Sequence, residues 1–262
     1  MSWLYHNLPP WLIAVAIIGA FVVTSVLGLL FFRRASRGRL FLNEEMNNDI
    51  IFFASAIGVF YSLMAGLMSV AVWGNYASVQ DLVSQEASSI GALYRNVTSL
   101  PEPARGELQE HLREYNAFLI EQTWPAQRRG LVLDEATRRV NAFADRLFAF
   151  NPETLGDQVR YAETMTQFNR MIELRRKRIG SIGGALPPVM WGIMLIGAAL
   201  TVGVTYLLKI STGVQVTLTA FLATFIGLVV FVMAGLDSPL TGPLAIEPTA
   251  YQVVQERLIN LK

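Results

Sequence analysis

Four apolar stretches without a charged side chain or a histidine dominate this sequence of 262 residues. They cover residues 11–32, 50–73, 186–208 and 214–236, and each contains 22 to 24 residues. At about 1.5 Å of rise per residue, a helix of this length crosses a hydrocarbon core of about 30 Å. Backbone polar groups in lipid need partners within their own segment, so we expect each stretch to be a membrane-spanning helix.

The four predicted spans form two pairs with a long polar region between them. We therefore expect an all-α, multi-pass integral membrane protein with a 2+2 arrangement of transmembrane helices and a helical extramembrane bundle between the pairs. The expected divisions are the first helix pair at 1–74, the bundle at 75–184, the second helix pair at 185–236, and a Pro/Gly-rich tail with a short amphipathic helix at 237–262. That last helix is expected to lie either on the bundle or on lipid headgroups.

Three patterns predict how the middle region is built. Helix-compatible residues continue beyond the second span to Val97, so one long helix is expected to leave the membrane intact. Apolar residues spaced by three and four predict a helix that ends at Trp124-Pro125 and another that starts near Asp134. Asn151 followed by Pro152 predicts the start of a further helix, with the asparagine as its cap.

Composition narrows the classes of function. Only 16% of the residues are charged and the formal net charge is +1, so no nucleic-acid partner is predicted. The absence of cysteine excludes disulfides, thiolate metal sites and cysteine nucleophiles. His111 shares its predicted helix with Glu107, Glu110 and Glu114, which we interpret as a solvated charged face rather than a metal site. No phosphate-binding or nucleophile motif occurs, so we expect no catalytic residues, no cofactor and no enzymatic activity.

Basic residues gather next to the first and third spans. The two clusters are Arg33, Arg34, Arg37 and Arg39, and Arg175, Arg176, Lys177 and Arg178. By the positive-inside rule the clusters favour opposite orientations, so the side on which the middle region lies stays open. We interpret both clusters as lipid-headgroup contacts or topology determinants.

The second span carries the most distinctive candidate surface. Small and aromatic residues recur along one side of it, namely Phe52, Ser55, Gly58, Ser62, Gly66 and Ser69. Such a stripe commonly packs helices together, because small residues allow close approach. If several copies surround an axis, the same stripe lines a pore. Both interpretations stay open.

Asp237 is the acidic residue closest to the fourth span. An ionisable group at this depth is a candidate functional residue. The structural alternative is a helix-ending carboxylate that binds Ser238 or an arginine of the basic cluster.

Short segments spread over nearly the whole chain resemble a known family. They are residues 70–73 with Tyr76, 86–87, 93–95, 100–103, Glu121 with 124–125, 186–187 with Trp191, and 236–242. In order and spacing this set resembles the bacterial bestrophin-like membrane proteins, a family catalogued as a domain of unknown function. Bestrophins proper are pentameric anion channels with a pore lined by the second span.

The resemblance implies a homo-oligomer, a pentamer by likeness, in the lipid bilayer of a bacterial plasma membrane, with chloride or another small ion as the permeant species. The leading hypothesis is accordingly a channel-like protein that passes anions along an axis bordered by the second span. The alternative is a non-conducting membrane scaffold or interaction protein in which the helical middle region binds a partner.

Overall fold

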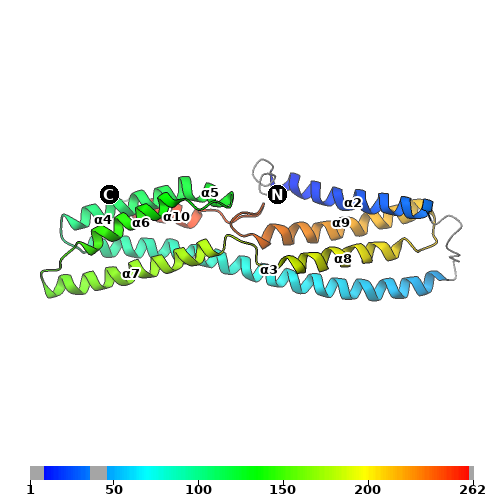
Figure 1. Ribbon diagram of the computed structural model, residues 1–262, viewed down its shortest axis with the longest axis horizontal. Coiled ribbons are helices and arrows are strands. Elements are labelled where there is room, and N and C mark those ends of the chain that lie inside the picture. The colour runs from blue at the N-terminus through cyan, green and yellow to red at the C-terminus, as the bar shows by residue number, and fades with distance from the viewer. Residues whose placement is uncertain (1–8, 36–45, 260–262) are drawn as a thin grey trace. The chain divides into compact units, whose positions relative to one another are not determined.

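The computed structural model describes residues 9–35 and 46–259, and this part of the chain is helical with no strand (Figure 1). The elements are α2 (Pro10–Ala35), α3 (Asn47–Thr98), α4 (Ala104–Phe118), the π-helical turn η2 (Leu119–Thr123), α5 (Trp124–Arg128), α6 (Asp134–Phe148), α7 (Leu155–Gly180), α8 (Pro188–Thr205), α9 (Thr212–Asp237), α10 (Thr249–Val254) and the π-helical turn η3 (Gln255–Ile259). Helices α2, α3, α8 and α9 are long and apolar enough to cross a membrane. The all-α membrane fold with four spans is confirmed.

The chain divides into two compact units. Of the described residues, the membrane unit contains 9–35, 46–75 and 184–237, and the bundle unit contains 76–183 and 238–259. Helix α3 belongs to both, because its 52 residues continue without a break. No proline interrupts residues 47–98, and the residues beyond the apolar segment are compatible with a helix. The expectation of one long second helix is confirmed.

Two glycines set the helix spacing in the membrane unit. A Cβ atom on Gly227 of α9 would lie 3.0 Å from the Cα atom of Ile18 in α2. A Cβ atom on Gly197 of α8 would lie 2.8 Å from the ring of Tyr61 in α3. Small residues here let the helices approach closely, which is how helices gain contact energy in lipid.

The bundle unit encloses one apolar core. Its fully buried side chains come from every long helix of the unit and include Ile90 and Leu93 of α3, Leu108 and Leu112 of α4, Leu147 of α6 and Met171 of α7. The C-terminal segment completes this core. Tyr251 of α10 is fully buried, and the backbone oxygen of Ile246 accepts a hydrogen bond of 3.0 Å from Trp124 Nε1. The amphipathic tail therefore packs on the bundle.

Two predicted helix ends were wrong. The helix before Trp124-Pro125 does not end there, because the π-helical turn η2 leads directly into α5 with Pro125 in its first turn. A proline has no N–H to contribute and is tolerated at this position. The start of α7 was the second error, since its cap is Thr154 and not Asn151.

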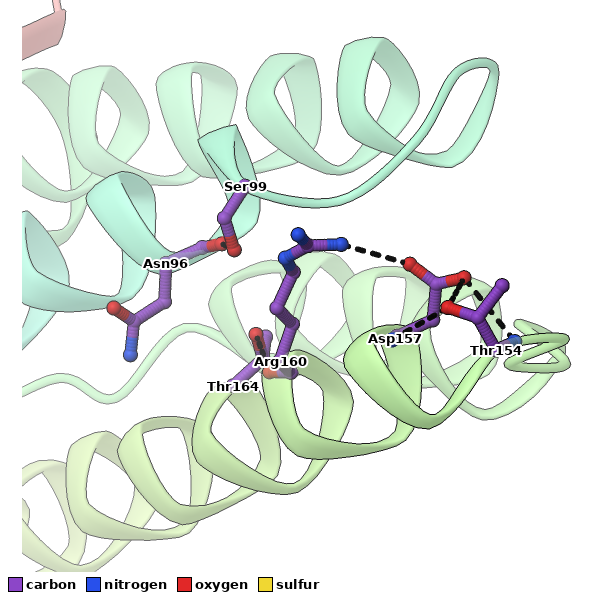
Figure 2. A network of polar contacts seen from close by, with 6 residues as sticks. All are labelled: Asn96, Ser99, Thr154, Asp157, Arg160 and Thr164. Carbon is purple, nitrogen blue, oxygen red and sulfur yellow. Dashed lines mark hydrogen bonds and ion pairs between the residues drawn. The ribbon is translucent and has the colours of Figure 1, made fainter.

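Figure 2 shows the hydrogen bonds that place the start of α7 at Thr154 rather than at Asn151. The Thr154 hydroxyl accepts a hydrogen bond of 3.0 Å from the Asp157 backbone N–H, and the Asp157 carboxylate accepts one of 3.3 Å from the Thr154 backbone N–H. This capping box satisfies two backbone donors at once. The hydrogen bond that the Thr154 hydroxyl donates to the Asp157 carboxylate is the largest cause that lowers the pKa of Asp157, and Arg160, 3.0 Å from the same carboxylate, lowers it further.

Candidate functional site

Among the described residues, most of the small-residue stripe of α3 is left uncovered by other helices. Ser55, Ser62 and Gly66 are exposed and Phe52 keeps 72% of its surface accessible, whereas Gly58 and Ser69 are half-buried. A Cβ atom on Gly58 or Gly66 would meet nothing within 4 Å, so neither glycine marks a close approach within the chain.

A different side of α3, about 120–140° around the helix from Ser62 and Ser55, makes the contacts inside the membrane unit. Met68 of α3 packs with Met194 and Ala198 of α8 and with Ile226 and Met233 of α9, and all five are buried. At about 100° per residue, this packed side cannot be the side that carries Ser55 and Ser62. The stripe is therefore free to face lipid, another copy of the chain or a water-filled axis.

The serine hydroxyls define what the stripe offers a solute. Ser55, Ser62 and Ser69 donate hydrogen bonds of 2.7, 2.9 and 2.8 Å to the backbone oxygens of Ile51, Val59 and Ala65, one helical turn earlier. Each hydroxyl hydrogen is thereby engaged, and the oxygen lone pairs stay available. The surface is neutral and presents acceptors, with the exposed ring of Phe52 near one end.

Asp237 joins the ends of α8 and α9. Its Oδ1 atom accepts hydrogen bonds of 3.0 and 2.9 Å from the backbone N–H groups of Ala185 and Leu186, and its Oδ2 atom accepts one of 3.2 Å from Trp191 Nε1. The side chain is buried, and a Cβ atom on Gly184 would lie 2.8 Å from Oδ2. These partners differ from the expected Ser238 or arginine. The carboxylate binds the chain that enters α8, because three N–H donors there compensate its charge.

A second buried carboxylate lies in the bundle unit. Glu86 of α3 receives two hydrogen bonds from the guanidinium of Arg178 in α7, of 2.5 Å from Nε and 3.0 Å from Nη2. Arg178 Nη1 donates a third, of 2.6 Å, to Gln127 Oε1, and the guanidinium lies 5.6 Å from the centre of the Trp124 ring. Glu86 and Arg178 are at most 1% exposed.

Burial and charge act in opposite directions on this pair. Desolvation is the largest single effect and lowers the pKa of Arg178, but the Glu86 carboxylate and two nearby tyrosines outweigh it and raise the pKa. Burial, followed by the charge of Glu86, raises the pKa of Tyr115 to about 12. The guanidinium therefore stays charged and the phenol stays neutral at physiological pH.

The structure corrects the interpretation of the second basic cluster. Arg178 and Arg175 are buried inside the bundle unit, where Arg175 Nη2 donates a hydrogen bond of 2.9 Å to Thr137 Oγ1, so neither side chain can reach lipid headgroups. Arg176 and Lys177 are exposed, and Lys177 pairs with Glu173 at 2.5 Å. The only local signal of this difference is the helical spacing of 175 and 178, which places both on one face of the helix.

The first basic cluster lies at one end of the membrane unit. Arg33 donates hydrogen bonds to Thr212 Oγ1 and to the backbone oxygen of Ile210, and Arg34 is exposed. Arg37 and Arg39 lie outside the described residues.

The glutamates around His111 bind arginines. Glu107 pairs with Arg146 of α6, and Glu114 pairs with Arg139 of α6 at 3.2 Å. Within residues 9–35 and 46–259 no group of three or more histidine, cysteine or acidic side chains is placed to hold a metal ion.

The chain is similar to known membrane proteins in sequence pattern and in fold. Residues 18–251 match the model of the bestrophin-like domain. Comparison with curated proteins finds no match. A membrane protein of known crystal structure has a TM-score of 0.67 at 10% identity, with 94% of this chain and 97% of that chain covered.

Two crystal structures of a bacterial bestrophin homologue from Klebsiella pneumoniae, each with a point mutation, are similar as well. Their TM-scores are 0.66 and 0.64 at 11% and 12% identity; 94% of this chain is covered in both cases, together with 97% and 98% of the homologue. At these identities the likeness shows a shared fold.

Proposed function

Because the chain belongs to the bestrophin-like family, we propose that it is a homo-oligomeric, channel-like protein of a bacterial plasma membrane, in which the α3 helices border a central axis. The observation that supports this proposal best is the exposed side of α3 with Ser55, Ser62 and Gly66. Small and hydroxyl residues on a spanning helix favour contact with another helix or with water over contact with lipid, and an axis surrounded by several copies of α3 would supply both.

The chemistry of the stripe suggests a weakly selective path for small ions. Chloride is the ion that the resemblance implies, and an anion needs hydrogen-bond donors. The hydroxyl of Ser62 donates to the backbone oxygen of Val59, so it must rotate before it can bind an anion. No charged side chain lies between Ile50 and Trp73 to favour one sign. We therefore expect modest discrimination between chloride and potassium along the span, with Phe52 near a hydrophobic constriction.

The test is ion flux in liposomes that contain the purified full-length protein, with chloride and potassium measured separately. Ser62→Phe places a large ring on the proposed wall and should block the flux. Leu67→Phe is the matched control, because Leu67 is also exposed on α3 but lies about 140° around the helix from Ser62. Flux that persists in Leu67→Phe and disappears in Ser62→Phe would support the proposed axis.

The oligomer must be verified before a negative result is interpreted. Native mass spectrometry of the solubilised protein gives the number of copies, for which five is the expectation from the resemblance. An intact oligomer without flux would argue against the channel and favour the non-conducting scaffold. In that case the bundle unit of the whole protein would be the surface on which to look for a bound partner.

A further inference from the structure

We propose that a groove at one end of the membrane unit binds an anionic phospholipid, with contacts to its phosphate and to the part of one acyl chain nearest the headgroup. The groove has a volume of about 630 Å³. Its lining residues are Leu27, Leu30, Phe31, Arg33, Arg34 and Thr212. This site is independent of conduction, since the scaffold alternative would carry it equally.

The position of the groove along the helices matches a bilayer interface. The apolar stretch of α2 ends at Phe32 and is followed at once by Arg33 and Arg34. Helix α9 begins at Thr212, immediately before its own apolar stretch. Both helices therefore change from polar to apolar residues at the groove. This change matches the level in a bilayer at which the lipid phosphates meet the hydrocarbon core.

The charged end of the groove is held in place. Arg33 donates hydrogen bonds to Thr212 Oγ1 and to the backbone oxygen of Ile210, which fixes its guanidinium between α2 and α9. Arg34 follows it and is exposed. None of the six lining residues is acidic. A guanidinium presents several N–H groups in a planar fork that fits phosphate oxygens, so two neighbouring arginines favour a phosphodiester.

The apolar end fits an acyl chain. Leu27, Leu30 and Phe31 are 60%, 44% and 74% exposed, and their spacing of three and four puts them on one side of α2. A zwitterionic headgroup would bring its own cation next to the arginines. Charge complementarity therefore selects a lipid that has a phosphate but no amine, for which phosphatidylglycerol is a suitable probe.

The test is native mass spectrometry of the full-length protein in detergent, titrated with phosphatidylglycerol or with phosphatidylcholine. We expect the wild-type protein to retain phosphatidylglycerol in preference to phosphatidylcholine. Arg34→Gln should weaken phosphatidylglycerol binding about fivefold, which is the effect of one basic residue beside an anionic lipid. Leu27→Ser should weaken it as well, because it removes apolar contact while it leaves both arginines in place.

The control for charge is Lys209→Gln. Lys209 is exposed in the connection between α8 and α9 but does not line the groove. If Lys209→Gln weakens binding as much as Arg34→Gln, the attraction is general and the proposed site is wrong. Equal retention of the two lipids would also overturn the proposal, and so would displacement of the lipid by inorganic phosphate, which would indicate a site for free anions.

Discussion

Glu86→Gln should strongly destabilise the bundle unit, because it leaves the guanidinium of Arg178 buried without a counter-charge. Arg178 is 1% exposed, and its neighbours raise its pKa. An arginine does not deprotonate even when its partner is lost, so the charge remains inside the unit. Removal of one partner from a buried ion pair costs about 3–5 kcal/mol.

The assay is thermal unfolding of the solubilised protein together with amide hydrogen exchange. At about 3–5 °C per kcal/mol, a value between those for smaller and larger domains, the unfolding midpoint should fall by about 9–25 °C. Exchange should accelerate in the bundle unit. Glu86→Gln combined with Arg178→Met removes both charges and should recover most of the lost stability. The attraction within a buried ion pair is largely offset by the cost of desolvating its two charges, so removal of the whole pair costs much less than removal of one partner.

Glu173→Gln is the control for this experiment. Glu173 also pairs with a basic side chain of α7, Lys177 at 2.5 Å, but both side chains are more than half exposed. Its replacement should leave the midpoint unchanged, since exposed ion pairs are screened by water. If Glu86→Gln behaves like Glu173→Gln, or if the double variant is no more stable than the single one, the reasoning from the buried charge is refuted.

Three further expectations concern other buried contacts. Asp237→Ala leaves two backbone N–H groups and an indole N–H without their acceptor, which should cost about 2–4 kcal/mol and lower the thermal midpoint, with Asp237→Asn less affected. Gly197→Ala should cost about 1–3 kcal/mol because its methyl group would lie 2.8 Å from the ring of Tyr61, while Gly66→Ala has nothing within 4 Å and should not change the midpoint. Burial raises the pKa of Tyr115 to about 12, so its contribution to stability is complete below pH 10 and is lost as the pH rises to about 12. Tyrosinate absorbance during an alkaline titration, compared with that of Tyr115→Phe, measures this last effect.

Much of the fold could be predicted from local patterns. The apolar stretches predicted the four spans, and the helix-compatible residues that continue beyond the second span predicted the long α3 helix. Helix ends were less predictable, because several residues near one end can act as the cap. Asn151 has the right chemistry, but the reciprocal hydrogen bonds between Thr154 and Asp157 determine where α7 begins.

The candidate sites depended more on tertiary contacts. The positions of Arg175 and Arg178 in a basic run predicted a surface cluster, and only the tertiary structure shows that both are buried, Arg178 against Glu86 of α3 and Arg175 beside Thr137 of α6. Asp237 was found by its position at the end of an apolar stretch. Its partners could not be found in this way, because Leu186 and Trp191 are about 50 residues away in sequence.

The apolar stretches alone are enough to predict a set of membrane-spanning helices, because an apolar segment of that length can satisfy its backbone hydrogen bonds in lipid only as a helix. Which side of α3 is uncovered, and which glycines make contacts, can be seen only in the folded chain: Gly197 and Gly227 lie against neighbouring helices, whereas Gly58 and Gly66 have no described atom within 4 Å of an added Cβ. The sequence does not distinguish a glycine that contacts a neighbouring helix from one that does not. The difference comes from how the helices are rotated against one another, and that rotation depends on side-chain packing between segments far apart in sequence.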